Sequence, residues 1–514
     1  MLTGDLNVTY SKVLAEKHYV FGNIGYNVSE NTYQEDIYNA EGFPNDKMNN
    51  VIFAKQYAKD GKPQGTESTK RDLGFLFAGN YTYDNRYLLD GSYRASASSS
   101  FGQNNRWGQF WSVGAGWNIH NETWMKGFEN LNLLKLRGSV GYTGSQNEDA
   151  YAAIASYKYF MDRNYDNFQG AYLKGMKNDD LRWQEKLDYN VGIDINIASN
   201  FTLKFDYYLA KTKNTLLDFT IPGSTGFSSV KENIGDVQNK GFDLYLTYTP
   251  WRVSQDRAYV TLTGAISHNK NKITGISDAM KQYNDRQDEL AGDRFKNRPV
   301  KKYYEGVSMN AIWAVPSLGI DPATGNEVFM GKDGKLTNTW QASDQVILGD
   351  DLPDFQGNFG VNGSWKGLSL GLVFRYQFGG QMYNQTLVDL VENADLNYNV
   401  DRRVYEGRWR NPGDVKPYKR LNYAYVLEDG EYERKQVLTQ PTSRFVQDRN
   451  ELSLSSVNLS YDMYRHQFIK KMGLELLRFS FYMNDVFTLS SIHIERGTSY
   501  PFARSFNFSL TATF

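Results

Sequence analysis

The chain has 514 residues, a formal net charge of −1 and no cysteine, which excludes a disulfide-stapled scaffold and thiol chemistry and gives no reason to expect a nucleic-acid partner. Aromatic residues make up 15% of the chain although its mean hydropathy is −0.60. That combination suits either buried soluble cores or a transmembrane barrel with aromatic side chains outside and a polar lumen. No run of eighteen apolar residues occurs, so a helical membrane span is excluded.

The first elements are a predicted hairpin and a long loop. Apolar residues alternate in residues 2–10 and 20–28, with a short polar break near Ala15-Glu16, and alternation at period two is typical of strands with one apolar face. From Glu30 to Lys70 the period is lost, and Asp46 to Tyr57 spaces its apolar residues nearer to a helical turn. We therefore expect a long loop that carries a short helix.

Residues 73–119 carry the clearest alternation in the chain. A first run ends at Tyr83, a second follows the two-residue break Asp84-Asn85, and a third spans Phe110 to Ile119. The pattern predicts a hairpin and a third strand that share an aromatic face. That face contains Leu73, Phe75, Phe77, Tyr81, Tyr83, Tyr87, Leu89, Tyr93, Trp111, Val113 and Trp117.

The same alternation predicts ten more strands, which brings the count to about fifteen. In residues 451–461 the apolar positions change parity between Leu454 and Val457, so we expect a β-bulge near Ser455-Ser456. The ten runs are residues 134–143, 189–197, 201–209, 242–248, 260–266, 359–365, 368–376, 451–461, 477–483 and 506–514.

The connections alternate between short and long along the chain. Short ones fall at Asp84, His120, Ser199, Trp251, Lys366 and Met463, and long ones at Ser98, Gly144, Lys213, Lys270, Gly379 and Asp485. Short and long connections therefore lie at opposite ends of the sheet, as in outer-membrane barrels with short periplasmic turns and long extracellular loops. The largest insertions are Asn269 to Gln356, with short strands expected around Ser308 to Val315, and Gly379 to Asn450.

The predicted fold is all-β, an antiparallel transmembrane β-barrel whose long extracellular loops contain short helices. Fifteen is an odd number, whereas single-chain bacterial barrels are usually even, so the chain is not expected to close alone. The polar parity of the strands would face the lumen, either to hydrate the interior or to contact a plug. The lumen-facing candidates are Arg86, Asp90, Arg94, Lys135, Arg137, Asp194, Lys204, Asp206 and Arg375.

The tryptophans divide into two groups. Those in the long loops, Trp183, Trp340 and Trp409, are candidates for stacking on sugar rings or packing on a partner, and the alternative is that each pins its own loop. Those near predicted strand ends, Trp111, Trp117, Trp251 and Trp365, are typical of an interfacial aromatic girdle.

Catalytic signatures are absent from the sequence. No nucleophile elbow, P-loop or dinucleotide fingerprint occurs, and the acidic pairs Asp179-Asp180 and Asp350-Asp351 fall in predicted loops. Isolated histidines without a second ligand at metal spacing argue against a metal site; they are His18, His120, His268, His466 and His493. We expect no enzymatic activity, no metal and no cofactor.

Several ordered segments resemble the C-terminal part of SusC/RagA-like TonB-dependent outer-membrane transporters, over nearly the whole chain. They are Arg86-Tyr87-Leu88, Arg106 to Ser112, Leu136 to Gly144, Asn233 to Gly241, Gly319 to Gly325, the stretch from Arg408-Trp409 to Gly413-Asp414, and Tyr500-Pro501.

The resemblance implies a place in the outer membrane of a Gram-negative bacterium, within its lipid. It also implies a barrel of about 22 strands, so roughly seven strands, the plug, the TonB box and the signal peptide are expected to be missing from residues 1–514, and the chain to be a C-terminal fragment. By this resemblance a SusD-like surface lipoprotein closes over the cargo and the TonB complex acts through the missing part. Glycans or oligosaccharides are the first expectation for the cargo and oligopeptides the second, with the two largest insertions carrying lid and substrate surface.

Two other classes stay open on the sequence: a passive porin-like barrel and a secreted β-rich glycan-binding protein with buried aromatic residues. Heat-modifiable migration on a gel and a requirement for detergent would distinguish a barrel from the soluble protein. An upstream plug-coding region would distinguish the transporter from the porin. The predicted topology also implies that an epitope tag at Gln103 is accessible from outside intact cells and that a tag at Asn85 is not.

Overall fold

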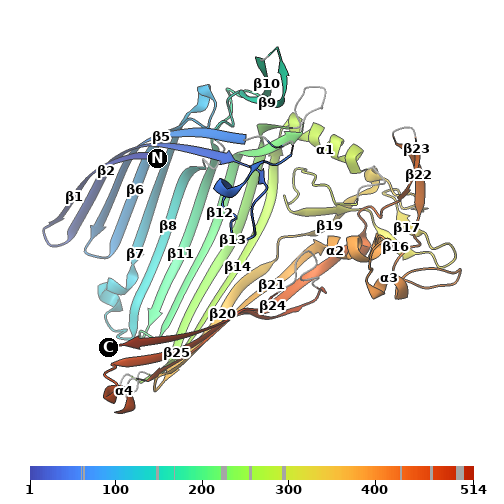
Figure 1. The fold of residues 1–514 in the computed structure, drawn as a ribbon. Helices are drawn as coiled ribbons and strands as arrows, with labels where there is room; N and C mark the ends of the chain where they lie inside the picture. Colours follow the sequence, from blue (N-terminus) through green and yellow to red (C-terminus); the bar gives the residue numbers. More distant parts are fainter. Residues whose placement is uncertain are drawn as a thin grey trace. The chain divides into compact units, whose positions relative to one another are not determined.

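In a computed structural model, fifteen strands of the described residues form one antiparallel sheet (Figure 1). The structure describes residues 1–59, 61, 64–145, 150–166, 168–220, 229–253, 258–291, 297–428, 431–463, 467–493 and 503–514. Each strand pairs with the next long strand along the chain. The predicted all-β class and the count of fifteen are confirmed. In sheet order the strands are β1 (Leu2–Leu14), β2 (His18–Ile37), β5 (Gln64–Tyr83), β6 (Tyr87–Ser98), β7 (Trp107–Asn118), β8 (Leu131–Ser145), β11 (Gln184–Ile197), β12 (Phe201–Thr220), β13 (Ser229–Val253), β14 (Ala258–Ile276), β20 (Phe355–Trp365), β21 (Leu368–Tyr383), β24 (Val446–Met463), β25 (Leu476–Ser490) and β26 (Phe506–Thr513).

The connections carry short ribbons and few helices. The paired short strands are β3 (Ala40–Glu41) with β4 (Gln56–Tyr57), β9 (Ser156–Tyr165) with β10 (Phe168–Gly175), β15 (Ala311–Ala314) with β19 (Val346–Asp350), the trio β16 (Ser317–Ile320), β17 (Glu327–Met330) and β18 (Leu336–Thr337), and β22 (Tyr423–Glu428) with β23 (Glu431–Gln436). The α-helices are α1 (Asp278–Ala291), α2 (Gln385–Leu387), α3 (Arg402–Glu406) and α4 (Gln467–Lys471). Single helical turns of other types lie at Val51–Phe53, Gln103–Asn105, Ile119–Asn121, Thr123–Met125, Ala342–Asp344, Val388–Glu392 and Ser443–Phe445.

The chain divides into two compact units. Unit 1 comprises Met1–Asn121, Arg137–Asn190 and Ala210–Val237, and unit 2 comprises Glu122–Leu136, Val191–Leu209 and Gln238–Phe514. In unit 1 the register pairs Phe77 with Tyr93 and Tyr93 with Trp111. Directly opposed residues share a face of a sheet, so the aromatic parity predicted for residues 73–119 does gather on one side of β5, β6 and β7.

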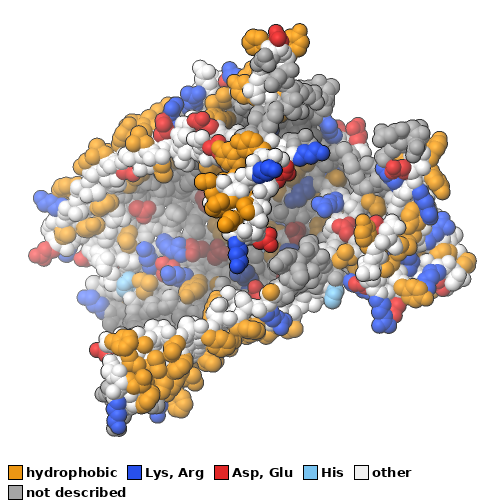
Figure 2. Space-filling view, viewed as in Figure 1, with side chains coloured by type: hydrophobic (Ala, Val, Ile, Leu, Met, Phe, Trp, Pro, Cys, Tyr) orange, Lys and Arg blue, Asp and Glu red, His pale blue; other side chains and the backbone are white. Residues whose placement is uncertain are grey.

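In unit 2 the apolar parity also gathers on one face. Leu459 on β24 lies opposite Phe481 on β25, and Phe481 lies opposite Phe508 on β26. Figure 2 shows hydrophobic side chains clustered over β25 and β26. Phe508 and Leu510 are mostly exposed, and an apolar groove of about 340 Å³ runs between these strands. A continuous apolar face without protein cover is the surface that lipid requires.

The predicted bulge is confirmed. On one side of β24, Val373 pairs with Ser456 and Phe374 with Leu454; on the other side the register to β25 shifts between Leu454 and Ser456. Ser455 is therefore the extra residue, and it returns the apolar side chains of β24 to one face.

Several strands run further than predicted. The register of β2 and β5 continues to the pair Ile37 and Gln64, so much of the loop expected between Glu30 and Lys70 is strand, and the expected short helix is the single turn Val51–Phe53. The loop predicted for Lys213 to Lys240 was wrong at both of its ends, because β12 extends to Thr220 and β13 begins at Ser229; its middle, residues 221–228, lies outside the described residues. Where both faces of a ribbon meet water, polar residues occupy both parities and the period-two signal disappears although backbone pairing continues.

The tight turns predicted at Asp84-Asn85 and at Ser199 are confirmed, whereas the short connections after Trp251 and Met463 include residues outside the described ranges. Asp84 and Asn85 both have positive φ, +49° and +52°, and so do Ala198 and Ser199; such turns match the twist of a hairpin. The two largest insertions are slightly shorter than expected, since β14 runs to Ile276 and β21 to Tyr383. Strand β15 confirms the expectation of short strands between Ser308 and Val315. The Tyr500-Pro501 segment and His466 lie outside the described residues.

Candidate functional site

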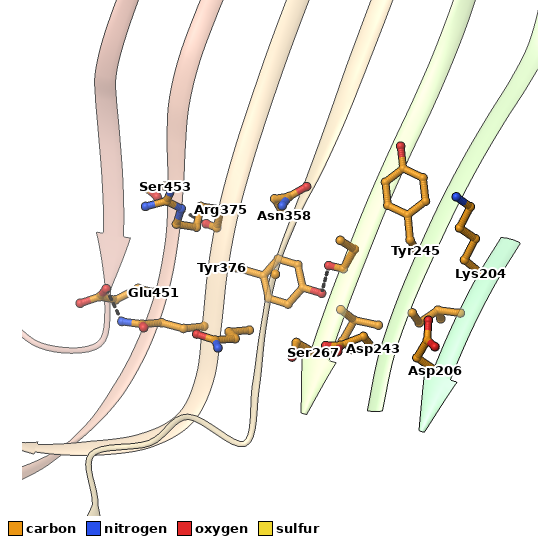
Figure 3. A pocket seen from close by; sticks show the side chains of 16 residues that line it. Lys204, Asp206, Asp243, Tyr245, Ser267, Asn358, Arg375, Tyr376, Glu451 and Ser453 are labelled. Carbon is orange, nitrogen blue, oxygen red and sulfur yellow. Dashed lines mark hydrogen bonds between the residues drawn. The ribbon is translucent and has the colours of Figure 1, made fainter. Parts of the chain in front are cut away.

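A polar concavity of about 610 Å³ lies on the sheet within unit 2 (Figure 3). Its charged side chains come from four strands: Lys204 and Asp206 on β12, Asp243 on β13, Arg375 on β21 and Glu451 on β24. We call this set the wall patch. Three of its five members, Lys204, Asp206 and Arg375, are among the residues predicted to face a lumen, and the structure brings them to one concavity.

The register explains how the β21 side of the wall patch is assembled. Arg375 lies opposite Asn358 and Ser453, and Gln377 lies opposite Glu451, so these polar side chains share one face of β20, β21 and β24. Gln377 donates from Nε2 to Oε2 of Glu451 over 2.5 Å. The patch offers cationic, anionic and amide groups to a polar solute, and nothing in it resembles a nucleophile with its base.

Tyr376 fixes the backbone behind the wall patch. Its hydroxyl donates to the carbonyl oxygen of Ala265 on β14 over 3.0 Å and so spans β20, which lies between them. Gly357 makes this possible, since a Cβ there would lie 1.9 Å from the Ala265 oxygen and 2.8 Å from the Tyr376 hydroxyl. The hydroxyl thus ties three neighbouring strands together.

Two members of the wall patch were missed by the sequence prediction. Asp243 occupies the parity opposite to the predicted apolar residues Phe242 and Leu244, so the alternation contained the signal. Glu451 occupies the parity opposite to Leu452 and Leu454, and the strand register places it opposite Gln377.

The predicted lumen residues of unit 1 lie on or beside β6 and β8. Arg86 lies in the turn before β6, where its Nη2 contacts Oδ2 of Asp84 at 2.8 Å. Asp90 and Arg94 lie opposite Gly114 and Phe110 on β7, away from the aromatic face. A Cβ at Gly114 would approach the Asp90 carboxylate to 2.6 Å, so this glycine makes room for the acid.

The remaining predicted residues belong to neighbouring strands. Lys135 and Arg137 lie two positions apart on β8, which places both on one face, and Asp194 lies on β11. None of these three lines the concavity that holds the wall patch.

Trp183 lies in a small hydrophobic core of unit 1. Its side chain is 4% exposed, stacks on Phe101 with ring centroids 4.3 Å apart, and meets Phe110 edge-on at 5.3 Å. Its indole Nε1 donates to the carbonyl oxygen of Arg106 over 3.1 Å. Leu181 completes this core. The contacts join the connection after β6 to the segment before β11.

Two of the segments that resemble the transporter family meet beside this core. Cβ atoms at Gly108 and Gly144 would lie 2.3 Å and 2.2 Å from the ring of Phe110. Gly108 belongs to the Arg106 to Ser112 segment and Gly144 to the Leu136 to Gly144 segment. The glycines of both segments therefore leave space for one aromatic ring.

The other two loop tryptophans make contacts between the two largest insertions of unit 2. Trp340 donates from Nε1 to the carbonyl of Pro441 over 3.0 Å, and Trp409 to that of Pro322 over 2.8 Å. Both side chains are partly exposed. Of the strand tryptophans, Trp111, Trp251 and Trp365 are exposed, as a girdle position requires.

A buried ionic cluster lies between the same insertions and was not predicted. Arg444 contacts Glu327 and Glu392, each at 2.7 Å, and the three side chains are 12%, 3% and 0% exposed. Burial acts to lower the pKa of Arg444, but the hydrogen bonds and charges of the two glutamates outweigh it and raise the pKa. Burial lowers the pKa of the neighbouring Lys419. Glu327, Glu392 and Arg444 are far apart in sequence, so no sequence motif predicts that they meet.

Histidine and carboxylate side chains form no metal-binding group in the described part of the chain. His18 shares a hydrogen bond of 2.8 Å between its Nδ1 and the hydroxyl of Tyr81, and His268 contacts the carbonyl of Asp354. No helix within the described ranges is both long enough and apolar enough to cross a bilayer.

Comparison with known proteins places these features in a family context. No family model matches the chain. The TonB-dependent receptor P39 of Formosa agariphila is 28% identical over 523 residues, which cover 94% of this chain and 48% of that receptor. The TonB-dependent receptor SusC of Bacteroides thetaiotaomicron is 30% identical over 243 residues, or 46% of this chain and 24% of SusC. The chain thus spans about half the length of P39, or less in the case of SusC.

Among solved structures, one described as the RagAB peptide transporter superposes with a TM-score of 0.78 at 22% identity, over 95% of this chain and 52% of that chain. This likeness concerns the fold, which is shared along nearly all of the sheet. Sequence and fold together identify the chain as SusC/RagA-like, the counterpart of the C-terminal barrel portion of a TonB-dependent receptor, a class of the Gram-negative outer membrane.

Proposed function

We propose that the chain forms barrel wall and extracellular mouth of an energised nutrient importer of the outer membrane. The observation that carries this proposal is the division of the sheet into an apolar and a polar face within each unit. In unit 1 aromatic residues share one face of β5, β6 and β7, and in unit 2 the apolar face of β24, β25 and β26 contrasts with the polar residues of the wall patch. The polar side would line the lumen, where Arg86, Asp90, Arg94, Lys135, Arg137 and Asp194 would hydrate the interior or contact a plug. The plug, the TonB box and the remaining strands would be supplied by residues outside this sequence. No catalytic step is part of the proposal.

The proposed cargo is a glycan or oligosaccharide. Polar groups of both charge signs in the wall patch suit a hydroxyl-rich solute. Oligopeptide cargo is the second candidate, favoured by the fold likeness to a structure described as a peptide transporter. A peptide would use the same groups through its amides and termini.

The proposed partner is a SusD-like surface lipoprotein that rests on the two largest insertions. Both insertions carry large apolar side chains that are mostly exposed, including Leu318 and Leu336 in one, and Tyr405 and Val415 in the other. Exposed apolar groups gathered on loops favour a protein contact. Trp340 and Trp409, which are partly exposed, belong to the same two insertions.

Uptake by cells that express the full natural chain tests the energised mechanism. We expect oligosaccharides to enter cells with a working TonB complex and not cells without it. Uptake of oligopeptides instead would replace the cargo and keep the mechanism. Uptake that is equal in both strains would support a passive pore, and recovery of the protein from the medium in soluble form would support a secreted binding protein.

Labelling of single cysteines tests the proposed orientation. This sequence has no cysteine of its own, and both Gln103, in the connection between β6 and β7, and Asn85, in the turn between β5 and β6, are exposed. On intact cells a membrane-impermeant maleimide should modify Gln103→Cys and spare Asn85→Cys until the outer membrane is permeabilised. The reverse pattern would show that the long connections face the periplasm.

A further inference from the structure

The two largest insertions of unit 2 are joined through their backbones. The first insertion comprises residues 277–354 and the second residues 384–445, with the β20–β21 hairpin between them in sequence. Val315 forms a parallel bridge with Thr442, and the amide of Ser443 donates to the carbonyl of Val315 over 3.0 Å. The amide of Ser317 donates to Oγ of Ser443 over 2.8 Å. One strand-like contact thus connects the start of β16 to the end of the second insertion.

A second contact between the insertions lies around Pro322. Its carbonyl oxygen accepts hydrogen bonds from the Trp409 indole and from the amide of Gly413, both over 2.8 Å. Gly325, at φ +71°, lies beneath the indole, since a Cβ there would be 2.3 Å from the Trp409 ring. The Gly319 to Gly325 and Arg408 to Asp414 segments therefore form one joint.

The mostly buried side chain of Arg444 makes a third contact between the insertions. Its Nε and Nη2 donate to the two carboxylate oxygens of Glu327 over 2.8 Å and 2.7 Å, and Nη2 also donates to Oε1 of Glu392 over 2.7 Å. Its Nη1 donates to the carbonyl of Pro417 over 2.7 Å. The guanidinium of Arg444 thus binds a carboxylate of the first insertion. It also binds two groups of its own insertion, the Glu392 carboxylate and the Pro417 carbonyl.

Both carboxylates depend on this guanidinium. Glu392 is fully buried; its Oε1 also accepts a hydrogen bond from Thr439, and its Oε2 has no hydrogen-bond partner within the described part of the chain. Glu327 is 4% exposed. Removal of one partner from a buried pair leaves an uncompensated charge, which is far more costly than the loss of a surface pair.

We propose that Arg444 is a latch that holds the two insertions together as one rigid loop platform, residues 277–354 with 384–445. A role of this latch in uptake rests on the function proposed above. In that case a lid or cargo that contacts one insertion contacts a platform formed by both. The insertions move as a unit while the Arg444 contacts persist, and breaking them releases both.

Hydrogen–deuterium exchange of the full natural chain in detergent tests the latch without reference to transport. In Arg444→Met, amides of Glu327–Met330 and of residues 388–408 should exchange on the order of a hundredfold faster, as expected for a broken buried ion pair. Amides of β20 and β21 should keep their wild-type rates. Unchanged exchange in Glu327–Met330 would overturn the proposal.

Two further variants separate the charge effect from lost packing. Arg402→Met removes an exposed pair with Glu406 in the same insertion and should leave all rates unchanged. The triple variant Glu327→Gln, Glu392→Gln, Arg444→Met strands no buried charge but still lacks the Arg444 contacts, so both insertions should exchange faster than in the wild type and more slowly than in Arg444→Met. Wild-type exchange in the triple variant would show that Arg444 only compensates the two glutamates, and the latch would be wrong. If the wild-type chain shows protected amides in both insertions but imports no cargo, the proposed function is wrong and the latch is unaffected.

Discussion

Replacing Trp183 with alanine should destabilise unit 1 by about 3–5 kcal/mol, the usual cost of truncating a buried tryptophan. The side chain is 4% exposed and contacts Phe101, Phe110 and Leu181 within one core, so its loss leaves a cavity that the surrounding connections fill only in part. Urea unfolding of the purified protein in detergent measures the change, with the near-ultraviolet signal of the aromatic core as a local probe.

Trp124→Ala is the matched control, because Trp124 is 62% exposed and surface substitutions usually change stability by less than about 0.5 kcal/mol. Trp183→Phe should keep the stack and lose only the hydrogen bond to Arg106, at about 0.5–1.5 kcal/mol. If Trp183→Ala keeps the wild-type stability but loses cargo binding, Trp183 stacks on sugar rings, which is the other role that the sequence left open.

Deletion of residues 385–444 should abolish uptake and co-purification of the lipoprotein while the sheet remains folded. The amide of Asn384 donates to the carbonyl of Phe445 over 2.8 Å, so a short glycine–serine linker can join the two ends without strain on β21 or β24. The deletion removes Arg444, Thr442 and Trp409, and with them the contacts that position the first insertion. Heat-modifiable migration reports the fold, and affinity capture with labelled cargo reports the function.

Removal of the β22–β23 ribbon alone, residues 423–436, is the control for this deletion. The ribbon pairs with itself, and the amide of Val437 donates to the carbonyl of Asn422 over 2.8 Å where it would be closed. Uptake should stay within about twofold of wild type, the range of an ordinary surface change. Normal uptake and lipoprotein binding in the larger deletion would contradict the role given to both insertions.

Alternation predicted the sheet because each strand between Leu73 and Trp117 has one lipid-type face and one polar face. The same reasoning found the extra residue at Ser455, since one inserted residue is enough to change the parity within a strand. It failed between Lys213 and Lys240, where β12 and β13 continue with polar residues on both parities. A strand without an apolar face has no period for the sequence to reveal.

The site was predictable only where it belongs to a strand. Lys204, Asp206 and Arg375 follow from parity, and the register of the sheet then adds Glu451 to their concavity. Glu327, Glu392 and Arg444 had no such signal, because charged residues in long connections are usually solvated. For Trp183 the sequence left a binding role and a packing role open, and its core depends on Phe101 and Leu181, which no repeat or motif connects to it.

The backbone bridge between Val315 and Thr442 bears on how such proteins can be recombined. A chimera that receives only one insertion from a relative would pair the relative's counterpart of Glu327 with the native Arg444, or the native Glu327 with the relative's counterpart of Arg444. It would also misalign the backbone contact between Val315 and Thr442. Cargo preference should therefore transfer between relatives only when both segments are exchanged together. The two insertions should therefore be exchanged as one pair of sequence blocks, separated by the β20–β21 hairpin.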